Sequence, residues 1–384
     1  MRGFCAYPFF SDFTAPVPQK GRGPKGRLDS MPEGYTHIRT ARAAARLANI
    51  EPADGAAFDC GANGPDMLFC YRVWRKSARR GEDLPKIGDR LHGENTGAFL
   101  QALLENAKTP AQQSYAMGFL CHYAADCALH PYVVMITKPG AAYGMPGGHG
   151  YFEIALDSFL HQKDTGKSAV SVNDNTPALS EEALEGAAEL LQAGIRAALG
   201  LTVSRRAVKD SFAHTRLLRR HFVSSLRIKY ALFWLVEPLF GGRGFITGHI
   251  TPAHLKGTGK NETPLPEVWE HPFTGEEQQA DLAALLEQAE RTGAAYMMAA
   301  QGYWQSKLRL EKVMSVIGSR SYLSGLEDEV SAPQPEETEE PAPEPAQPEL
   351  PEQPEVQEQE PEEAGEPKWQ DIDIFDELDH NSVG

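Results

Sequence analysis

Three polar side chains recur at regular intervals in a helical segment of small and apolar residues. His122, Asp126 and His130 are four residues apart within GFLCHYAADCALHP. Each four-residue step on an α-helix advances by about 40°, so the three side chains share one face. Burying polar groups without partners is costly. The chain must therefore fold so that each of these three polar side chains has a hydrogen-bond or metal partner. A metal ion could partner all three groups, and the alternative is that each histidine is merely structural.

Helical periodicity dominates the rest of the chain, and strand-like alternation is almost absent, which predicts an all-α fold. Helical patterns cover 36–50, 67–80, 88–107, 110–131, 150–163, 180–199, 203–236, 276–300 and 301–323. The fourth of these helices is expected to stop near Pro131, because proline disrupts helix interiors. Residues 55–66, 140–149 and 240–274 are Gly- or Pro-rich and are expected to be irregular.

The negative charge of the chain is concentrated at its C-terminal end. Of 53 acidic and 37 basic residues, 18 acidic and one basic lie in 331–384, which leaves 35 acidic and 36 basic in 1–330. Bulk charge therefore gives the folded part no attraction for a polyanion, and nucleic acid is not an expected partner. The acidic segment also holds ten prolines in 54 residues, a composition typical of disorder.

These patterns predict three regions. Residues 1–30 form a disordered N-terminal extension, 31–325 an all-α domain, and 326–384 a disordered acidic tail. Met31 is an alternative start of the protein. Within the tail, Trp369 and Phe375 belong to a segment, 369–378, that could be a short docking motif for a protein partner or simply solvated chain end.

The cysteine count and the termini favour a cytoplasmic protein. Five cysteines in 384 residues do not form a disulfide scaffold, and an odd number fits a reducing compartment. The N-terminus lacks the features of a secretory signal, and no uncharged apolar run is long enough to span a bilayer. The longest apolar stretch, 230–240, is interrupted by Glu237 and Pro238 and is expected to be a buried or partner-facing helix.

A second polar pair supports the metal interpretation. His149 and Glu153 are again four residues apart, and His37, Asp66 and His92 lie upstream. Imidazole and carboxylate are ligands that suit zinc, with bond lengths of about 2.0–2.2 Å. The spacing therefore favours zinc over a set of unrelated structural histidines.

Five motifs occur in an order that resembles a known family. They are YTHIRTA (35–41), GANGPD (61–66), GDRLH (88–92), GFLCHYAADCALHP (118–131) and HGYFE (149–153). Together they resemble the zinc-dependent phospholipase C family, which includes bacterial phospholipases C and is similar to the N-terminal domain of the glycosylphosphatidylinositol-specific phospholipase D. Single-strand zinc nucleases are more distant relatives. The resemblance covers about residues 31–240, and could extend to 325.

The resemblance implies an all-α fold around two or three zinc ions. His92, His122 and Asp66 resemble the ligands of one ion, and Asp126 bridges toward a neighbour. His130, His149 and Glu153 resemble the ligands of a second ion. His37 resembles the side-chain ligand of a third, shared with Asp126.

The third site departs from the family pattern. In the secreted enzymes the free N-terminal amine and carbonyl also hold that ion, whereas here thirty residues precede Met31. Either translation starts nearer Met31, another group completes the site, or the site is vacant. Asp66 has a second possible role, because its family counterpart is a proposed catalytic base. The ligand role is favoured, since one carboxylate does not easily serve as both.

Residues beside the ligands receive separate predictions. Asp157, one turn after Glu153, either orients a ligating histidine or is an exposed helix charge. The cysteines near the motifs are expected to be buried apolar residues rather than zinc thiolates. They are Cys60, Cys70, Cys121 and Cys127.

The resemblance implies a phosphoric diester hydrolase that cleaves a phospholipid head group, or a related phosphodiester, with a zinc-activated water. Two alternatives stay open. One is a zinc nuclease or phosphomonoesterase using the same metals, with arginines such as Arg39 and Arg72 as phosphate contacts. The other is a non-enzymatic, metal-stabilised adaptor that displays the acidic docking tail.

Overall fold

The structure is a computed structural model that describes residues 34–75, 81–224, 228–237, 247–260 and 262–328. Twelve α-helices lie in these ranges: α1 (Tyr35–Ala48), α2 (Gly55–Gly61), α3 (Leu84–Leu91), α4 (Thr96–Asn106), α5 (Pro110–Thr137), α6 (Gly148–Thr165), α7 (Val172–Asn175), α8 (Glu181–Leu199), α9 (Arg205–His221), α10 (Ile228–Val236), α11 (Leu282–Trp304) and α12 (Leu310–Ile317). Two 3-10 helices and two strands complete the description: η1 (Gly64–Leu68), η4 (Thr247–His249), β1 (Val268–Glu270) and β2 (Glu277–Gln279). The all-α prediction is confirmed.

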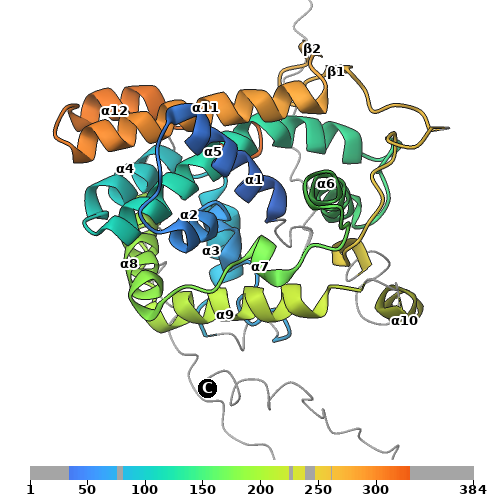
Figure 1. The fold of residues 1–384 in the computed structure, drawn as a ribbon, viewed down its shortest axis with the longest axis horizontal. Helices are drawn as coiled ribbons and strands as arrows, with labels where there is room; N and C mark the ends of the chain where they lie inside the picture. The colour runs from blue at the N-terminus through green and yellow to red at the C-terminus, as the bar shows by residue number, and fades with distance from the viewer. Residues whose placement is uncertain (1–33, 76–80, 225–227, 238–246, 261, 329–384) are drawn as a thin grey trace, which may run out of the picture.

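Helix α5 is the centre of the fold. It packs against α11, α2 and α1, and its C-terminal half also contacts α6. In Figure 1, α11 and α12 run along one edge, α9 runs along the opposite edge, and α1, α2 and α3 lie between them. A capping box at Thr109 and Gln112 starts α5, where each side chain accepts a hydrogen bond from the other's backbone N–H. This start agrees with the sequence prediction.

Two large apolar clusters share α5. One contains Leu100, Phe119 and Leu190, and joins α4, α5 and α8. The other contains Tyr132, Phe152 and Leu286, and joins the end of α5 to α6 and α11. The polar stripe of α5 therefore lies on the helix that both clusters hold.

The expected end of the central helix near Pro131 was wrong. Helix α5 continues to Thr137 with Pro131 inside it. A proline in a helix interior costs roughly 3 kcal/mol. The last turns nevertheless bury Tyr132, Val133 and Ile136 in the second cluster, and this burial outweighs the local cost.

Several other boundaries also differ from the prediction. Residues 55–66, expected to be irregular, form α2 and begin η1, whereas 69–75 are turns rather than the predicted helix. The predicted helix 88–107 is two helices, because Asn95, which lies between them, adopts a left-handed conformation with φ of 51°. The predicted helix 203–236 is likewise divided into α9 and α10.

A short antiparallel hairpin was also missed. Val268 pairs with Gln279, and Glu270 pairs with Glu277. Its strands are three residues long, too short for period-two alternation to be visible in the sequence. The hairpin buries Trp269 in the second cluster, so it closes the fold beside α5 and α11.

None of the helices that the structure describes is both long and apolar enough to cross a membrane. The extension 1–30, the tail from residue 329 and its docking segment 369–378 lie outside the described residues. The three-region division and the docking motif therefore stay predictions.

Candidate metal centre

The polar stripe of α5 is buried and points to one side of the helix. His122 is 0 % exposed and Asp126 is 2 % exposed. The distance from His122 Nε2 to Asp126 Oδ2 is 3.0 Å, and that from His130 Nδ1 to the same oxygen is 3.8 Å. The spacing argument thus describes the geometry of this helix correctly, and Asp126 lies in the middle of the stripe.

Asp66 and His92 approach the first half of this stripe from other elements. Asp66 lies on η1, and His92 is the residue at which α3 ends. His92 Nε2 is 3.0 Å from Asp66 Oδ1 and 3.9 Å from Asp126 Oδ2. His92, His122 and Asp126 place candidate ligand atoms within 4.8 Å of one another.

Gly64 allows η1 to lie directly against the ring of His122. Its φ is +54°, and a Cβ on this residue would be 2.1 Å from His122 Cδ2. Only glycine tolerates both the left-handed backbone and this contact. The local sequence Gly-Pro-Asp therefore brings Asp66 beside α5.

A second group forms between α5 and α6. His149 Nε2 is 3.0 Å from Glu153 Oε1, and His130 Nε2 is 3.5 Å from the same oxygen. These three residues also place ligand atoms within 4.8 Å of one another. The structure thus brings together the trio that the resemblance assigned to a single ion.

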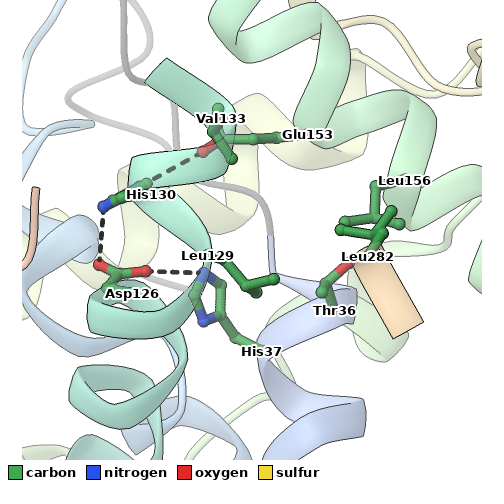
Figure 2. Close-up of a pocket in the computed structure, with 9 residues that line it drawn as sticks. All are labelled: Thr36, His37, Asp126, Leu129, His130, Val133, Glu153, Leu156 and Leu282. Atoms are coloured by element: carbon green, nitrogen blue, oxygen red, sulfur yellow. Dashed lines mark ion pairs between the residues drawn. The ribbon is translucent and has the colours of Figure 1, made fainter. Parts of the chain in front are cut away.

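His37 reaches the centre from the first turns of α1. Its Nε2 lies 3.4 Å from Asp126 Oδ1, and its ring centroid is 4.4 Å from that of His122. His37, Asp66 and His122 form a third set of possible ligands. Figure 2 shows the line of ion pairs from His37 through Asp126 and His130 to Glu153. All eight predicted ligands therefore lie in one connected cluster.

Backbone carbonyls orient three of the imidazoles. The Nδ1–H groups of His92, His122 and His130 donate to the carbonyls of Gly88, Ala62 and Tyr322, at 2.7, 3.2 and 3.0 Å. A carbonyl can only accept, so Nε2 of each neutral ring keeps its lone pair directed into the cluster. This arrangement is usual for metal-ligating histidines. Sequence reasoning missed the carbonyl partners, because Tyr322 is distant in the chain and carbonyls leave no mark in the sequence.

Buried atoms without hydrogen-bond partners show that the cluster suits a metal. Among the described residues, His37 Nδ1, His122 Nε2 and Asp126 Oδ2 are buried and make no hydrogen bond. The last two are 3.0 Å apart but are not aligned to bond each other. Leaving such atoms unsatisfied costs about 1–3 kcal/mol each. Zinc would satisfy the nitrogen and oxygen lone pairs of His122 and Asp126.

The charges of the cluster are strongly coupled. Burial, helped by the neighbouring His122, lowers the pKa of His37 to about 4. Burial also opposes protonation of His130, but Asp126 and Glu153 outweigh it and raise its pKa to about 10. Burial likewise opposes the charge of Asp126, yet His122 and His130 hold its pKa well below the usual range. Asp126 is therefore ionised at neutral pH, as metal binding requires.

An opening beside the cluster is part polar and part apolar. Its polar lining consists of Thr36, His37, Asp126, His130 and Glu153, and its apolar wall consists of Leu129, Val133, Leu156 and Leu282. In Figure 2, Leu156 and Leu282 lie near Thr36 and away from the ion-paired residues, whereas Leu129 and Val133 lie close to those residues. A ligand in this pocket would thus contact candidate metal ligands and hydrocarbon together.

The prediction that Asp157 is an exposed helix charge was wrong. The residue is 1 % exposed, so it is not a surface charge. Its carboxylate accepts hydrogen bonds from the backbone of Tyr35 and Thr36, at 2.9 and 2.6 Å, and not from a candidate ligand. Asp157 therefore acts on the start of α1.

Three of the four cysteines agree with the prediction that they are buried apolar residues. Cys60, Cys70 and Cys121 are buried, and Cys127 is partly exposed. Burial raises the pKa of Cys60 to about 12, which keeps the thiol protonated. None of the three ligand groups found in the described residues contains a cysteine.

A comparison with protein families supports the zinc interpretation. The family model described as zinc dependent phospholipase C matches residues 36–199. The matched span includes all eight predicted ligands, and the predicted resemblance is confirmed over it. No curated protein and no solved structure matches the chain.

Proposed function

We propose that this protein is a zinc-dependent phosphodiester hydrolase whose substrate is a phospholipid or a related phosphodiester. The observation that carries the proposal is the connected cluster, in which buried ligand atoms of Asp126 and His122 face one another without hydrogen bonding. The family match over residues 36–199 supports both the metal and the reaction class.

The eight candidate ligands would hold two or three ions, divided as the family resemblance implies. His92, His122 and Asp66 would form one site, and His130, His149 and Glu153 a second. His37 and Asp126 would contribute to a third. Zinc lowers the pKa of a bound water and offsets phosphate charge, which is the chemistry that phosphodiester hydrolysis needs.

We assign Asp66 to the ligand role rather than the base role. Its Oδ1 lies 3.0 Å from His92 Nε2, and it belongs to one of the groups with mutual distances within 4.8 Å. A carboxylate with one oxygen near His92 and the other near His122 is poorly placed to accept a proton from a substrate water. Variants that separate the roles are Asp66→Asn, which keeps a neutral oxygen ligand, and Asp66→Ala, which removes it.

The apolar wall supports a lipid as substrate. Leu129, Leu156 and Leu282 adjoin the same opening as His37 and Glu153. Apolar side chains next to a polar centre exclude water and can contact the hydrocarbon of a lipid. A free phosphomonoester or short nucleotide would leave this wall uncovered.

Turnover by Asp126→Asn tests the proposal. Asp126 lies between both halves of the cluster, so the variant should lose at least about 100-fold in hydrolysis of phosphatidylcholine, as other changes to catalytic electrostatics do. Asp89→Asn makes the same substitution at an exposed position of α3 and should retain wild-type turnover. Circular dichroism would show that both variants are folded.

Three results would contradict the proposal. Unchanged turnover in Asp126→Asn would remove the cluster from the reaction. Faster cleavage of single-stranded oligonucleotides than of phosphatidylcholine would favour the nuclease. A wild-type chain that binds zinc and cleaves neither class of substrate would favour the adaptor.

A further inference from the structure

One face of α6 connects the second ligand group to the start of α1. His149, Glu153 and Asp157 follow one another at four-residue steps, so they share this face. The first two residues belong to a candidate metal group. The third is buried at 1 % exposure and has another function in the fold.

Asp157 provides the N-terminal cap that α1 lacks in its own sequence. Helix α1 begins after Gly34, which offers no side-chain hydrogen bond to the first turn. Asp157 Oδ2 accepts from the Tyr35 N–H at 2.9 Å, and Oδ1 accepts from the Thr36 N–H at 2.6 Å and the Thr36 hydroxyl at 2.5 Å. A carboxylate in this place satisfies exposed N–H groups and complements the helix dipole.

The capped residues lie directly before a candidate ligand. Thr36 precedes His37, lines the same opening, and is itself 5 % exposed. His37 Nε2 lies 3.4 Å from Asp126 Oδ1 across the space between α1 and α5. A shift of the first turn of α1 would change this distance directly.

A second carboxylate of α6 holds α1 without touching the backbone of that turn. Asp164 Oδ2 accepts from the Tyr35 hydroxyl at 3.0 Å and from Arg39 Nε at 2.8 Å. Its side chain is 31 % exposed. It attaches α1 to α6 as Asp157 does, but it does not determine the position of the Thr36–His37 peptide.

We infer that Asp157 is a positioning residue for the His37 metal site, acting through the backbone and hydroxyl of Thr36. Helix α6 then serves both ends of the cluster: it supplies His149 and Glu153 as ligands, and it fixes His37 through Asp157. The inference rests on the proposed zinc-binding function.

The test measures zinc rather than turnover. Zinc per chain is determined by elemental mass spectrometry, and affinity by competition with a chromophoric chelator, for the full chain. His37→Ala defines the ion that depends on His37. Asp157→Asn should lower the affinity for that ion by roughly 10-fold or more, as loss of a residue that orients a ligand does. It should leave unchanged the affinity for the other ion, the one that is lost in His149→Ala.

Substitutions at Thr36 keep the test valid if Asp157→Asn does not fold. Thr36→Val removes only the hydroxyl that donates a hydrogen bond to Asp157, and it should lower the affinity for the same ion. Thr36→Ser keeps that hydroxyl and should bind zinc as the wild type does. Asp164→Asn is the control for general loosening between α1 and α6, and it should also retain wild-type affinity.

The outcomes separate this inference from the proposed function. A wild-type chain that binds no zinc overturns both. Wild-type zinc content and affinity in Asp157→Asn and Thr36→Val overturn the positioning role alone, as does a His37→Ala variant that loses no ion. Equal loss in Asp164→Asn would show a structural effect of the helix contact and would also overturn it.

Discussion

At the scale of single residues, metal binding at the candidate centre depends on how each candidate ligand is oriented. The Nδ1–H groups of His92, His122 and His130 donate to main-chain carbonyls, so their Nε2 atoms face the cluster. The carboxylate of Asp126 lies between His122 and His130, and that of Glu153 between His130 and His149. Small displacements of one ring should therefore affect metal binding more than they affect folding.

Gly64 is the residue at which such a displacement can be produced. Gly64→Ala puts a methyl group against the His122 ring, where the ideal Cβ would be 2.1 Å from Cδ2, at a φ of +54°. We expect a loss of roughly 1–3 kcal/mol of stability from the clash, in addition to the backbone strain, and reduced zinc content. Thermal denaturation and elemental analysis would measure the two effects.

Gly200→Ala is the matched control for this substitution. Gly200 also has a positive φ, +68°, but no atom lies within 4 Å of its ideal Cβ. Gly200→Ala should lower the free energy of unfolding only by the cost of a left-handed backbone, about 1–2 kcal/mol, and should leave zinc content unchanged. Equal zinc content in both variants would show that the contact between Gly64 and His122 does not matter for the site.

The protonation of His130 predicts how zinc binding depends on pH. In the zinc-free protein Asp126 and Glu153 overcome the effect of burial and raise the pKa of His130 from 6.5 to about 10. Its contribution to stability is therefore complete below pH 6.5 and lost as the pH rises through about 10. At pH 8 zinc must displace this proton, because a ligating imidazole is neutral.

Calorimetry in buffers of different ionisation enthalpy would count the protons released at pH 8. His130→Asn should release about one proton fewer than the wild type. His254→Gln changes an exposed histidine that pairs with Glu262, and it should release as many protons as the wild type. A proton count that does not change in His130→Asn would contradict the raised pKa.

At the scale of helices, local patterns predicted the site better than they predicted the helix ends. His122, Asp126 and His130 are positioned by the period of one helix, which the sequence contains in full. The ends of α3 and α5 depend on tertiary contacts. Helix α3 ends just before the candidate ligand His92, and α5 continues through Pro131 because Tyr132 is buried. No local signal reports either effect.

The capping box of α5 should contribute to stability without affecting the metal centre. Thr109 accepts a hydrogen bond from the Gln112 N–H, and the Gln112 side chain accepts one from the Thr109 N–H. Thr109→Ala should lower the free energy of unfolding by about 1 kcal/mol and leave zinc content unchanged. Thr109→Ser keeps the acceptor and should stay close to the wild type in urea denaturation. A loss of zinc in Thr109→Ala would mean that the first turn of α5 is coupled to the stripe.

At the scale of the whole molecule, the candidate ligands come from segments that do not adjoin in the chain. They belong to α1, η1, the end of α3, α5 and α6, and they meet beside the helix that both large apolar clusters share. The all-α fold could be predicted from helical periodicity, and the candidate ligand set from the motifs and their order. The hydrogen bond from His130 to the Tyr322 carbonyl could not be predicted from the sequence, because it depends on how the chain returns to α5 after α12.

Removing zinc should therefore lower the stability of the whole domain. A ligand that binds only the folded state at a concentration about 1,000 times its Kd adds about 4 kcal/mol, and here each ion would join several helices. We expect a chelator to lower the thermal midpoint of the wild type and of Asp89→Asn by similar amounts. Asp126→Asn should begin from a lower midpoint and respond less, since Asp126 contacts His37, His122 and His130. An equal chelator response in Asp126→Asn would show that the stabilising metal does not depend on Asp126, for example an ion held by His130, His149 and Glu153.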